Sequence, residues 1–272
     1  MDTGRMLKVA RNLAFVLLLL AAAGAVSAAD AVALRPLAPP IPTELPPGEL
    51  GKMVALGRDI VNNTNTHPLS RQYVGNSLAC SSCHREAGTD PKALSFLGAA
   101  SVYPTYASRE KNIITLEDRN LNCFMRSMNG IRPPNGSVVS VALSTYITWL
   151  SEGYPLRMSL NGPFGPNASP SLAIDPDDGN VPHGKILYAS VCAGCHGIDG
   201  AGVGKSPPVW GAQSYNDGAG MVQDLKLATY LKSAMSFGSV VLSDQDALDI
   251  ATYVNAQPRP RFVLKDHLGS RK

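Results

Sequence analysis

The sequence has little net charge. Its 24 Lys and Arg residues against 21 Asp and Glu give a formal charge of +3. Without residues 1–29, which carry three basic residues and one acid, the charge would be +1 (3 − 3 + 1). A nucleic-acid-binding protein usually concentrates basic charge on one surface or segment. The composition therefore gives no support to a nucleic-acid role.

The sequence also has only one extended apolar run, and it is too short to span a bilayer comfortably. Leu13 to Val26 has 14 residues, fewer than the ~20 that a membrane helix needs. Basic residues precede this run and small residues follow it, which is the pattern of a cleavable secretory signal peptide. We expect export to the periplasm, removal of residues 1–29 and no membrane span in the remaining chain. An uncleaved membrane anchor is the alternative.

Cysteine is scarce as well, with five residues in the chain. Exported proteins normally pair their cysteines in disulfides. Here four of the five fall into two Cys-x-x-Cys-His motifs, formed by Cys80, Cys83 and His84 and by Cys192, Cys195 and His196. This motif is typical of covalent c-type haem attachment, with a zinc or disulfide site as the alternative. Cys123 is the odd cysteine and is expected to be either a reactive thiol or a ligand.

The motif works by geometry. Its two thiols form thioethers with the haem vinyl groups, and the adjacent histidine then becomes the proximal iron ligand. Two such motifs predict two covalently bound haem c groups, ligated by His84 and His196.

The chain divides into two similar halves around these motifs. Each half shows a helix, a motif, a loop, a middle helix and a C-terminal helix, which is a weak internal repeat. We expect a mainly α protein made of two class I cytochrome c-like domains, each with one covalently attached haem. The predicted parts are a signal peptide (1–29), a Pro-rich N-terminal arm (30–48), cytochrome c domain 1 with the catalytic haem (49–155), a linker (156–180), cytochrome c domain 2 with the electron-transfer haem (181–260) and a C-terminal tail (261–272).

Apolar periodicity and capping residues predict the helices. The expected helices cover residues 48–62, 116–128, 138–151, 184–191, 222–234 and 243–255. Thr115 and Ser243 are the expected N-caps of two of them. The remaining histidines, His67, His183 and His267, are expected at the surface or as caps.

Each haem iron needs a sixth ligand or an open position. In the second half, Met235 follows His196 by 39 residues (235 − 196) and ends a helix, where cytochromes c often place a methionine ligand. Met221 is the alternative ligand, and core packing is the other interpretation for both methionines.

Cys123 follows His84 by the same 39 residues (123 − 84), which places it in the corresponding position of the first half. A buried structural cysteine is the alternative, and Met125 and Met128 are nearby alternative ligands. A thiolate lowers the iron potential relative to methionine. We therefore expect a low-potential, reactive haem 1 and a higher-potential haem 2 that draws electrons away.

The neighbours of Cys123 favour an anionic substrate. Arg119, Cys123 and Ser127 are spaced i, i+4 and i+8, so they share one face of the predicted helix. Arg109 is expected to close the site from the preceding loop. Arginine suits oxyanions because its planar fork is permanently charged. The alternative is that these arginines bind haem propionates.

Four segments carry a family resemblance: GNSLACSSCH (75–84), NCFMRSMNG (122–130), NDGAGM (216–221) and LSDQDALDI (242–250). In these segments the chain resembles the dihaem thiosulfate dehydrogenases of the TsdA family. The resemblance implies a periplasmic enzyme that couples two thiosulfates into tetrathionate, with the reverse reduction also open to it. It further implies that electrons pass through both haems to an external acceptor such as a small c-type cytochrome or a high-potential iron–sulfur protein.

The resemblance also implies roles for individual residues. Cys123 would be the distal ligand of haem 1, either leaving the iron or reacting at its sulfur, and Arg109, Arg119 and Ser127 would line the site. The family uses methionine on haem 2, sometimes exchanging with a lysine. Ala234 precedes Met235, so the lysine directly before it is absent, and Lys232 and Lys205 are the only near candidates.

Three other functions stay open at this point. A dihaem electron-transfer cytochrome would have no substrate of its own, although it would more naturally use methionine or histidine in place of Cys123. A Sox-type cytochrome would conjugate thiosulfate to a carrier protein and would need a partner. A dihaem peroxidase would need a haem site open to hydrogen peroxide.

Overall fold

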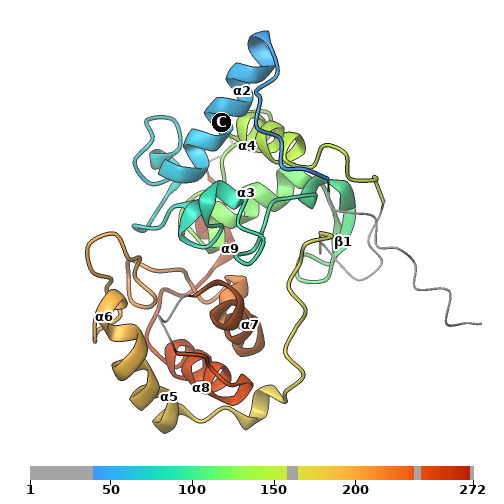
Figure 1. Cartoon of the computed structure of the whole chain (residues 1–272). Coiled ribbons are helices and arrows are strands. Elements are labelled where there is room, and N and C mark those ends of the chain that lie inside the picture. Colours follow the sequence, from blue (N-terminus) through green and yellow to red (C-terminus); the bar gives the residue numbers. More distant parts are fainter. Residues whose placement is uncertain (1–38, 158–164, 236–239, 270–272) are drawn as a thin grey trace, which may run out of the picture. The chain divides into compact units, whose positions relative to one another are not determined.

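The computed structural model describes residues 39–157, 165–235 and 240–269, and the described chain is mostly helical (Figure 1). The helices and strands are α2 (Gly48–Asn63), β1 (Thr105–Ala107), β2 (Asn112–Ile114), α3 (Leu116–Arg126), α4 (Val138–Trp149), α5 (Val181–Leu187), α6 (Ala193–His196), α7 (Asp224–Ala234), α8 (Asp244–Asn255) and α9 (Leu264–His267). Short 3₁₀ turns lie at Arg71–Tyr73, Cys80–Ser82, Glu86–Gly88, Ala99–Val102, Pro176–Asp178 and Gly220–Val222, and a π-turn at Tyr188–Cys192. The predicted signal peptide and the start of the predicted arm lie outside the described residues.

The first region is built around a close crossing of α2 and α4 (Figure 1). A Cβ added to Gly57 of α2 would lie 2.1 Å from the carbonyl oxygen of Ala142 in α4, so only glycine allows the two backbones to come this close. Apolar side chains on both helices, including Val54 and Tyr146, form the surrounding core. The predicted amphipathic character of both helices thus gives the region its core.

The second region repeats this crossing with α5 and α8. A Cβ added to Gly184 of α5 would lie 1.9 Å from the carbonyl oxygen of Asp249 in α8. Tyr188, Trp210 and Tyr253 form an aromatic cluster beside the crossing, with ring centroids 4.8 to 5.8 Å apart. The two halves of the chain therefore fold on the same plan, as the internal repeat predicts.

The helix boundaries follow the predicted capping residues where these are strong. Thr115 accepts a hydrogen bond from the backbone N–H of Asp118, and Ser243 caps α8 through the same reciprocal arrangement. The helix predicted over residues 184–191 is displaced toward the N-terminus. It begins at Val181 because the Asn180 side chain accepts a hydrogen bond from the N–H of His183, with a proline in the first turn, and it passes into the π-turn.

The β1–β2 hairpin, the short helix α6 and helix α9 have no counterpart in the prediction. The β1–β2 hairpin pairs Thr105 with Ile114 and precedes α3 directly. Helix α9 lies in the predicted C-terminal tail, where His267 is buried, stacks on Phe262 and donates from Nδ1 to the Gly130 carbonyl oxygen at 2.6 Å. The expectation that His267 is a surface or capping residue is therefore wrong, because the end of the chain folds back onto the first region.

The arm and the linker also pack on the first region where they are described. Pro39 lies against Gly153, and Asn167 donates to the Leu97 carbonyl oxygen (2.8 Å) and the Tyr154 hydroxyl (3.0 Å). Among the described residues, no helix combines the length and the apolar character that a membrane crossing requires.

Candidate active site

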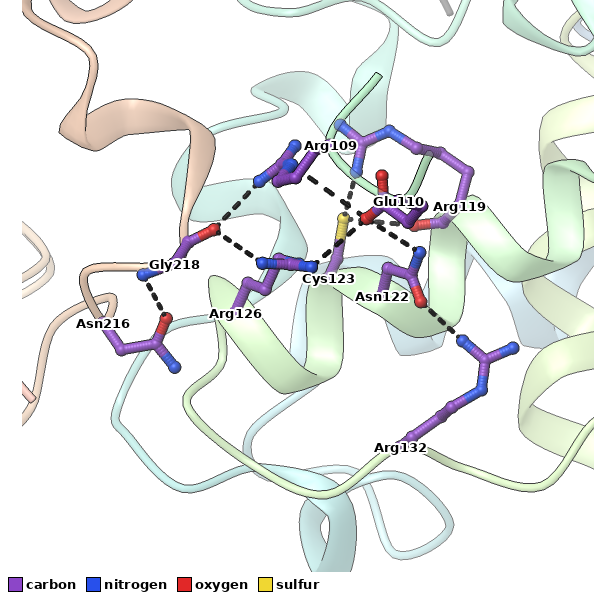
Figure 2. Close-up of polar contacts among 9 residues, drawn as sticks. All are labelled: Arg109, Glu110, Arg119, Asn122, Cys123, Arg126, Arg132, Asn216 and Gly218. Atoms are coloured by element: carbon purple, nitrogen blue, oxygen red, sulfur yellow. Dashed lines mark hydrogen bonds and ion pairs between the residues drawn. The ribbon is translucent and has the colours of Figure 1, made fainter. Parts of the chain in front are cut away.

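Helix α3 positions the candidate site (Figure 2). Its apolar side, with Leu121 and Phe124, is buried in the protein, which fixes the rotation of the helix about its axis. The capping box at Thr115 fixes where the helix starts. The other side then presents Arg119 and Cys123, one turn apart, as the i, i+4 spacing predicts.

Arg119 and Cys123 are in direct contact. Arg119 Nη1 donates to Cys123 Sγ at 3.2 Å (Figure 2). The negative charge of the Cys123 thiolate raises the pKa of Arg119, and this effect outweighs the opposing effect of burial. The sulfur of Cys123 therefore lies beside a permanently charged guanidinium that donates a hydrogen bond to it.

Tyr103 is a further member of this cluster that the sequence did not indicate. Burial raises the pKa of its phenol to about 12, while the charge of Arg119 and a hydrogen bond with its side chain act in the opposite direction. Tyr103 is thus a neutral hydroxyl held against the arginine that contacts Cys123. It lies outside α3, so helical spacing carried no sign of it.

The charge of Cys123 affects the two thiols of the first haem motif. Burial raises the pKa of Cys80 to about 12 and of Cys83 to about 11, and the charge of Cys123 contributes in the same direction to both. Cys123 therefore lies close to the motif thiols although it follows them by some forty residues, as expected of a residue on the distal side of haem 1.

The proximal histidines fit the haem prediction. His84 Nδ1 donates to the Leu94 carbonyl oxygen at 2.5 Å, and His196 Nδ1 donates to the Pro207 carbonyl oxygen at 2.8 Å. Because a carbonyl oxygen only accepts, the Nδ1 atom carries the proton and Nε2 keeps its lone pair for a metal. Burial lowers the pKa of His84 to about 4, which keeps the ring neutral, the form that ligates iron.

The thiols fit the same prediction. All five cysteines are free, so within the described residues the two motifs form no disulfide. Each motif thus offers two unpaired thiols and one oriented imidazole, which is the set that covalent haem attachment requires.

A polar network holds α3 in place beside the Cys123 site (Figure 2). The carboxylate of Glu110 accepts from Asn122 Nδ2 at 3.2 Å and from Arg126 Nη2 at 3.4 Å. Arg132 donates to the other end of the Asn122 amide at 2.6 Å. No role was predicted for these residues, although Asn122 and Arg126 both lie inside one of the segments that carry the family resemblance.

A loop of the second region completes the network. The Gly218 carbonyl oxygen accepts from Arg109 Nη1 at 2.9 Å and from Arg126 Nη1 at 3.3 Å. The fully buried Asn216 donates to the Met125 carbonyl oxygen at 2.8 Å and to Asn129 Oδ1 at 3.0 Å. The C-terminal end of α3 is therefore held by residues that follow it by about ninety positions.

The other two predicted site residues lie near this cluster without touching the Cys123 sulfur. Arg109 is exposed and its guanidinium is directed toward Gly218, with its Nε atom 4.0 Å from Glu110 Oε1. Ser127 caps α3, and its N–H donates to the Cys123 carbonyl oxygen. The Ser127 carbonyl oxygen in turn accepts from Asn76 Nδ2 at 2.9 Å. Both residues border the site, and their roles toward a substrate stay a prediction.

Two methionines are the predicted alternatives for the sixth ligand of the second haem. Met235 ends α7, is half-buried and packs against Tyr230 and Ala234. Met221 packs against each of the three hydrophobic clusters that the described residues form, which favours a packing role for it. The ammonium of Lys232 is paired with Asp244, which does not favour it as an iron ligand.

Two protein-family models match this chain. Residues 71–156 match the model described as SoxA/TsdA, cytochrome c domain, and residues 179–254 match the model described as cytochrome C oxidase, cbb3-type, subunit III. These matches confirm the prediction of two cytochrome c domains. They also imply two covalently bound c-type haems, in agreement with the two motifs.

Curated relatives extend this likeness over most of the chain. The thiosulfate dehydrogenase of Allochromatium vinosum is 35% identical over 89% of this chain and 92% of its own length. The thiosulfate dehydrogenase of Thiomonas intermedia is 38% identical over 82% of this chain and 71% of its own.

A solved structure agrees with these relatives. The thiosulfate dehydrogenase TsdBA of Marichromatium purpuratum, in its as-isolated form, is 35% identical with a TM-score of 0.75. The match covers 82% of this chain and 49% of that chain, so the present chain spans about half of that longer protein.

Proposed function

The chain belongs to the family of thiosulfate dehydrogenases, and we propose that it couples two thiosulfate ions into tetrathionate at the Cys123 site. In this reaction one S–S bond forms between the two outer sulfur atoms and two electrons leave, while no atom or proton is lost. The observation that carries the proposal is the contact between Arg119 and Cys123 beside the first haem motif.

The residues that would hold the cofactors follow from the site. Cys80 and Cys83 would bind haem 1 covalently, and His84 and Cys123 would ligate its iron. The second haem would be held by Cys192 and Cys195, with His196 and Met235 as ligands. When bound, the haems supply the one-electron acceptors that the removal of two electrons from thiosulfate requires.

The arginines would offset the repulsion between the substrates. Two thiosulfate dianions bring four negative charges into one site, and their approach is opposed unless cations lie beside them. Arg119 supplies one guanidinium at the Cys123 sulfur, and Arg109 supplies a second from the loop before β2. The planar fork of each can bind two oxygens of one sulfonate group.

Cys123 and Ser127 would complete the binding of the substrate. The half-buried sulfur of Cys123, which accepts a hydrogen bond from Arg119, would present a nucleophile to the substrate. The Ser127 hydroxyl lies one turn further along the helix and is able to donate a hydrogen bond to a sulfonate oxygen. The same groups would bind tetrathionate, so the site is also suited to the reverse reduction.

We place the enzyme in the periplasm. Covalent haem attachment takes place outside the cytoplasm, and residues 1–29 have the pattern of a cleavable signal peptide. Its electron acceptor would be an external one-electron carrier, such as a small c-type cytochrome or a high-potential iron–sulfur protein.

Replacing Cys123 with glycine tests the proposal. We expect the purified variant to keep both haems, measured as haem absorbance per protein, and to lose tetrathionate formation by at least about a hundredfold. The assay supplies thiosulfate and an artificial acceptor, without a carrier protein, and measures tetrathionate directly. Activity of the variant near that of the unaltered protein, with both haems attached, would contradict the assignment of Cys123.

The same assay on the unaltered chain distinguishes the other functions. Because it contains no carrier protein, tetrathionate formation in it excludes both a conjugating cytochrome and a cytochrome without a substrate. Low-spin electron paramagnetic resonance signals typical of thiolate ligation, present in the unaltered chain and absent from Cys123→Gly, would identify Cys123 as the iron ligand.

A further inference from the structure

Helix α7 belongs to the second region, yet one of its faces meets the first haem motif. The hydroxyl of Tyr230 donates to the Cys83 carbonyl oxygen at 3.2 Å. One turn later, the guanidinium of Arg85 donates to the Ala234 carbonyl oxygen. Positions 230 and 234 lie one above the other on a helix, and position 226 lies one turn earlier on the same face.

Lys226 occupies this earlier position, in the first turn of α7. Its side chain is exposed, as a residue that meets a dissolved ion must be. Its ammonium is close enough to Arg109 and Arg119 for repulsion to be felt, since partial burial and then these two charges lower the pKa of Lys226. The helical face therefore directs Lys226 toward the first region, and its ammonium lies within electrostatic range of the same two arginines.

Lys226 also has no acidic partner among the residues that the structure describes, whereas Lys52 pairs with Glu49 and Lys232 with Asp244. The positive charges of Arg109, Arg119 and Lys226 repel one another in the free protein, and no carboxylate among the described residues pairs with the Lys226 ammonium. An anion bound between them converts this repulsion into attraction.

We propose that Lys226 is a third cationic substrate-binding residue of the thiosulfate site, contributed by the second domain. The proposal rests on the proposed function, because it assigns Lys226 to the binding of the same anions. Arg109 and Arg119 carry two positive charges, and Glu110 lies beside Arg109, whereas the two substrates carry four negative charges. Lys226 adds a charge on the side of the site that α3 does not cover.

Three variants test the role of Lys226. In Lys226→Gln we expect the KM for thiosulfate to rise about tenfold, with a weaker dependence on salt and a smaller change in kcat. Lys226→Arg keeps the charge and should restore most of the affinity. Lys185→Gln removes an exposed lysine of α5 in the same domain and is the matched control, with unchanged kinetics.

Binding without turnover gives a second measurement. Thiosulfate titrated calorimetrically into the fully reduced holoprotein cannot be oxidised, so the dissociation constant reports binding alone. We expect this constant to rise about tenfold in Lys226→Gln and to stay unchanged in Lys185→Gln.

Two results would overturn the assignment of Lys226. The first is equal KM and dissociation constants for thiosulfate in Lys226→Gln and Lys185→Gln. The second is a shifted haem potential, or a changed KM for the electron acceptor, without a change for thiosulfate, which would make Lys226 a propionate or acceptor contact. Failure of the unaltered protein to bind thiosulfate would instead overturn the proposed function, and Lys226 with it.

Discussion

The two regions share one scaffold and differ in their middle helices. Both cross two helices at a glycine, Gly57 in the first and Gly184 in the second. Both orient the motif histidine through a backbone carbonyl, that of Leu94 and that of Pro207. The repeat thus reproduces the parts that would hold a haem.

The middle helices carry the difference. Counting from each motif histidine, position 39 is Cys123 in the first region and Met235 in the second, and position 35 is Arg119 in the first (119 − 84) and Leu231 in the second (231 − 196). The first helix therefore presents a hydrogen-bonded arginine and cysteine where the second presents two apolar residues. A few substitutions on one helix separate the proposed reactive site from the proposed electron-transfer site.

The largest expected effect comes from replacing Arg119 of the first region with leucine, the residue that the second region has at the corresponding position, Leu231. Arg119→Leu leaves the Cys123 thiolate without its donor and removes a substrate cation. Since a charge-assisted hydrogen bond contributes about 1.5–3 kcal/mol, we expect the thiosulfate KM to rise about 10- to 100-fold. We also expect a lower potential of haem 1, because hydrogen bonds to a ligating sulfur tune the potential. Steady-state kinetics and redox titration measure the two effects.

The control for this variant is Arg71→Leu, which removes an exposed arginine of the first region. It should leave both KM and potential unchanged. Equal behaviour of the two variants would mean that the difference between the middle helices has no part in substrate binding.

The next effect tests the shared scaffold. We expect Gly57→Ala and Gly184→Ala each to lower the free energy of unfolding by about 2–3 kcal/mol, because the added methyl group forces the crossing helices apart. Denaturant unfolding followed by haem absorbance and circular dichroism measures the loss. Gly220→Ala is the control, since nothing lies within 4 Å of an added Cβ there. A loss in only one of the two crossing variants would show that the crossings are not equivalent.

The smallest expected effect concerns the start of α5 in the second region. A buried carboxylate from α8 stabilises this helix start, and the start of α2 in the first region has no side-chain cap. The buried Asp249 carboxylate accepts from the Asn180 N–H (2.9 Å), from His183 Nδ1 (2.7 Å) and from Gln245 Nε2 (2.7 Å). Helix α2 of the first region instead starts after Pro47, which provides no side-chain cap. Burial by itself would raise the pKa of Asp249, but these hydrogen bonds outweigh it and hold the pKa below its ordinary value.

A depressed pKa sets the sign of the pH dependence. The carboxylate of Asp249 stabilises the fold above its unfolded pKa of about 4, and this contribution disappears as the pH falls through the lower folded pKa. We expect Asp249→Asn to cost about 1–3 kcal/mol at pH 7 and less at pH 3, measured by urea unfolding. Glu152→Gln, at an exposed position, is the charge-matched control. An equal loss at both pH values would show that packing alone accounts for Asp249.

Local rules predicted much of the fold and part of the site. The capping box at Thr115 and the apolar spacing of α3 fixed a helix, and the helix then placed Arg119 against Cys123. The two Cys-x-x-Cys-His motifs predicted two covalently bound haems, because each motif is contained in five adjacent residues. These predictions needed no knowledge of contacts between distant segments.

Contacts between distant segments explain what sequence reasoning missed. Glu110 accepts a hydrogen bond from Asn122 of α3, and Asn216 donates one to the Met125 carbonyl oxygen. Lys226 lies on a face of α7 that is directed toward the other region. The neighbouring sequence of Glu110 and Lys226 gives no sign of these contacts, and the segment that begins at Asn216 carries the family resemblance without indicating a role for that side chain. His267 was misjudged for the same reason, since its burial depends on the chain returning to Gly130.

The loop at Asn216 and Gly218 has a consequence for the evolution and engineering of the molecule. If the halves arose by duplication, they have since lost their modularity, because one half supplies hydrogen bonds that the helix of the other lacks on its own. A chimera in which an unrelated monohaem cytochrome replaces the second half would keep two haem sites. It would lose the hydrogen bonds that the loop at Asn216 and Gly218 makes with the first half. Donor modules for such grafts therefore need to be chosen by their loops as well as by their redox potentials.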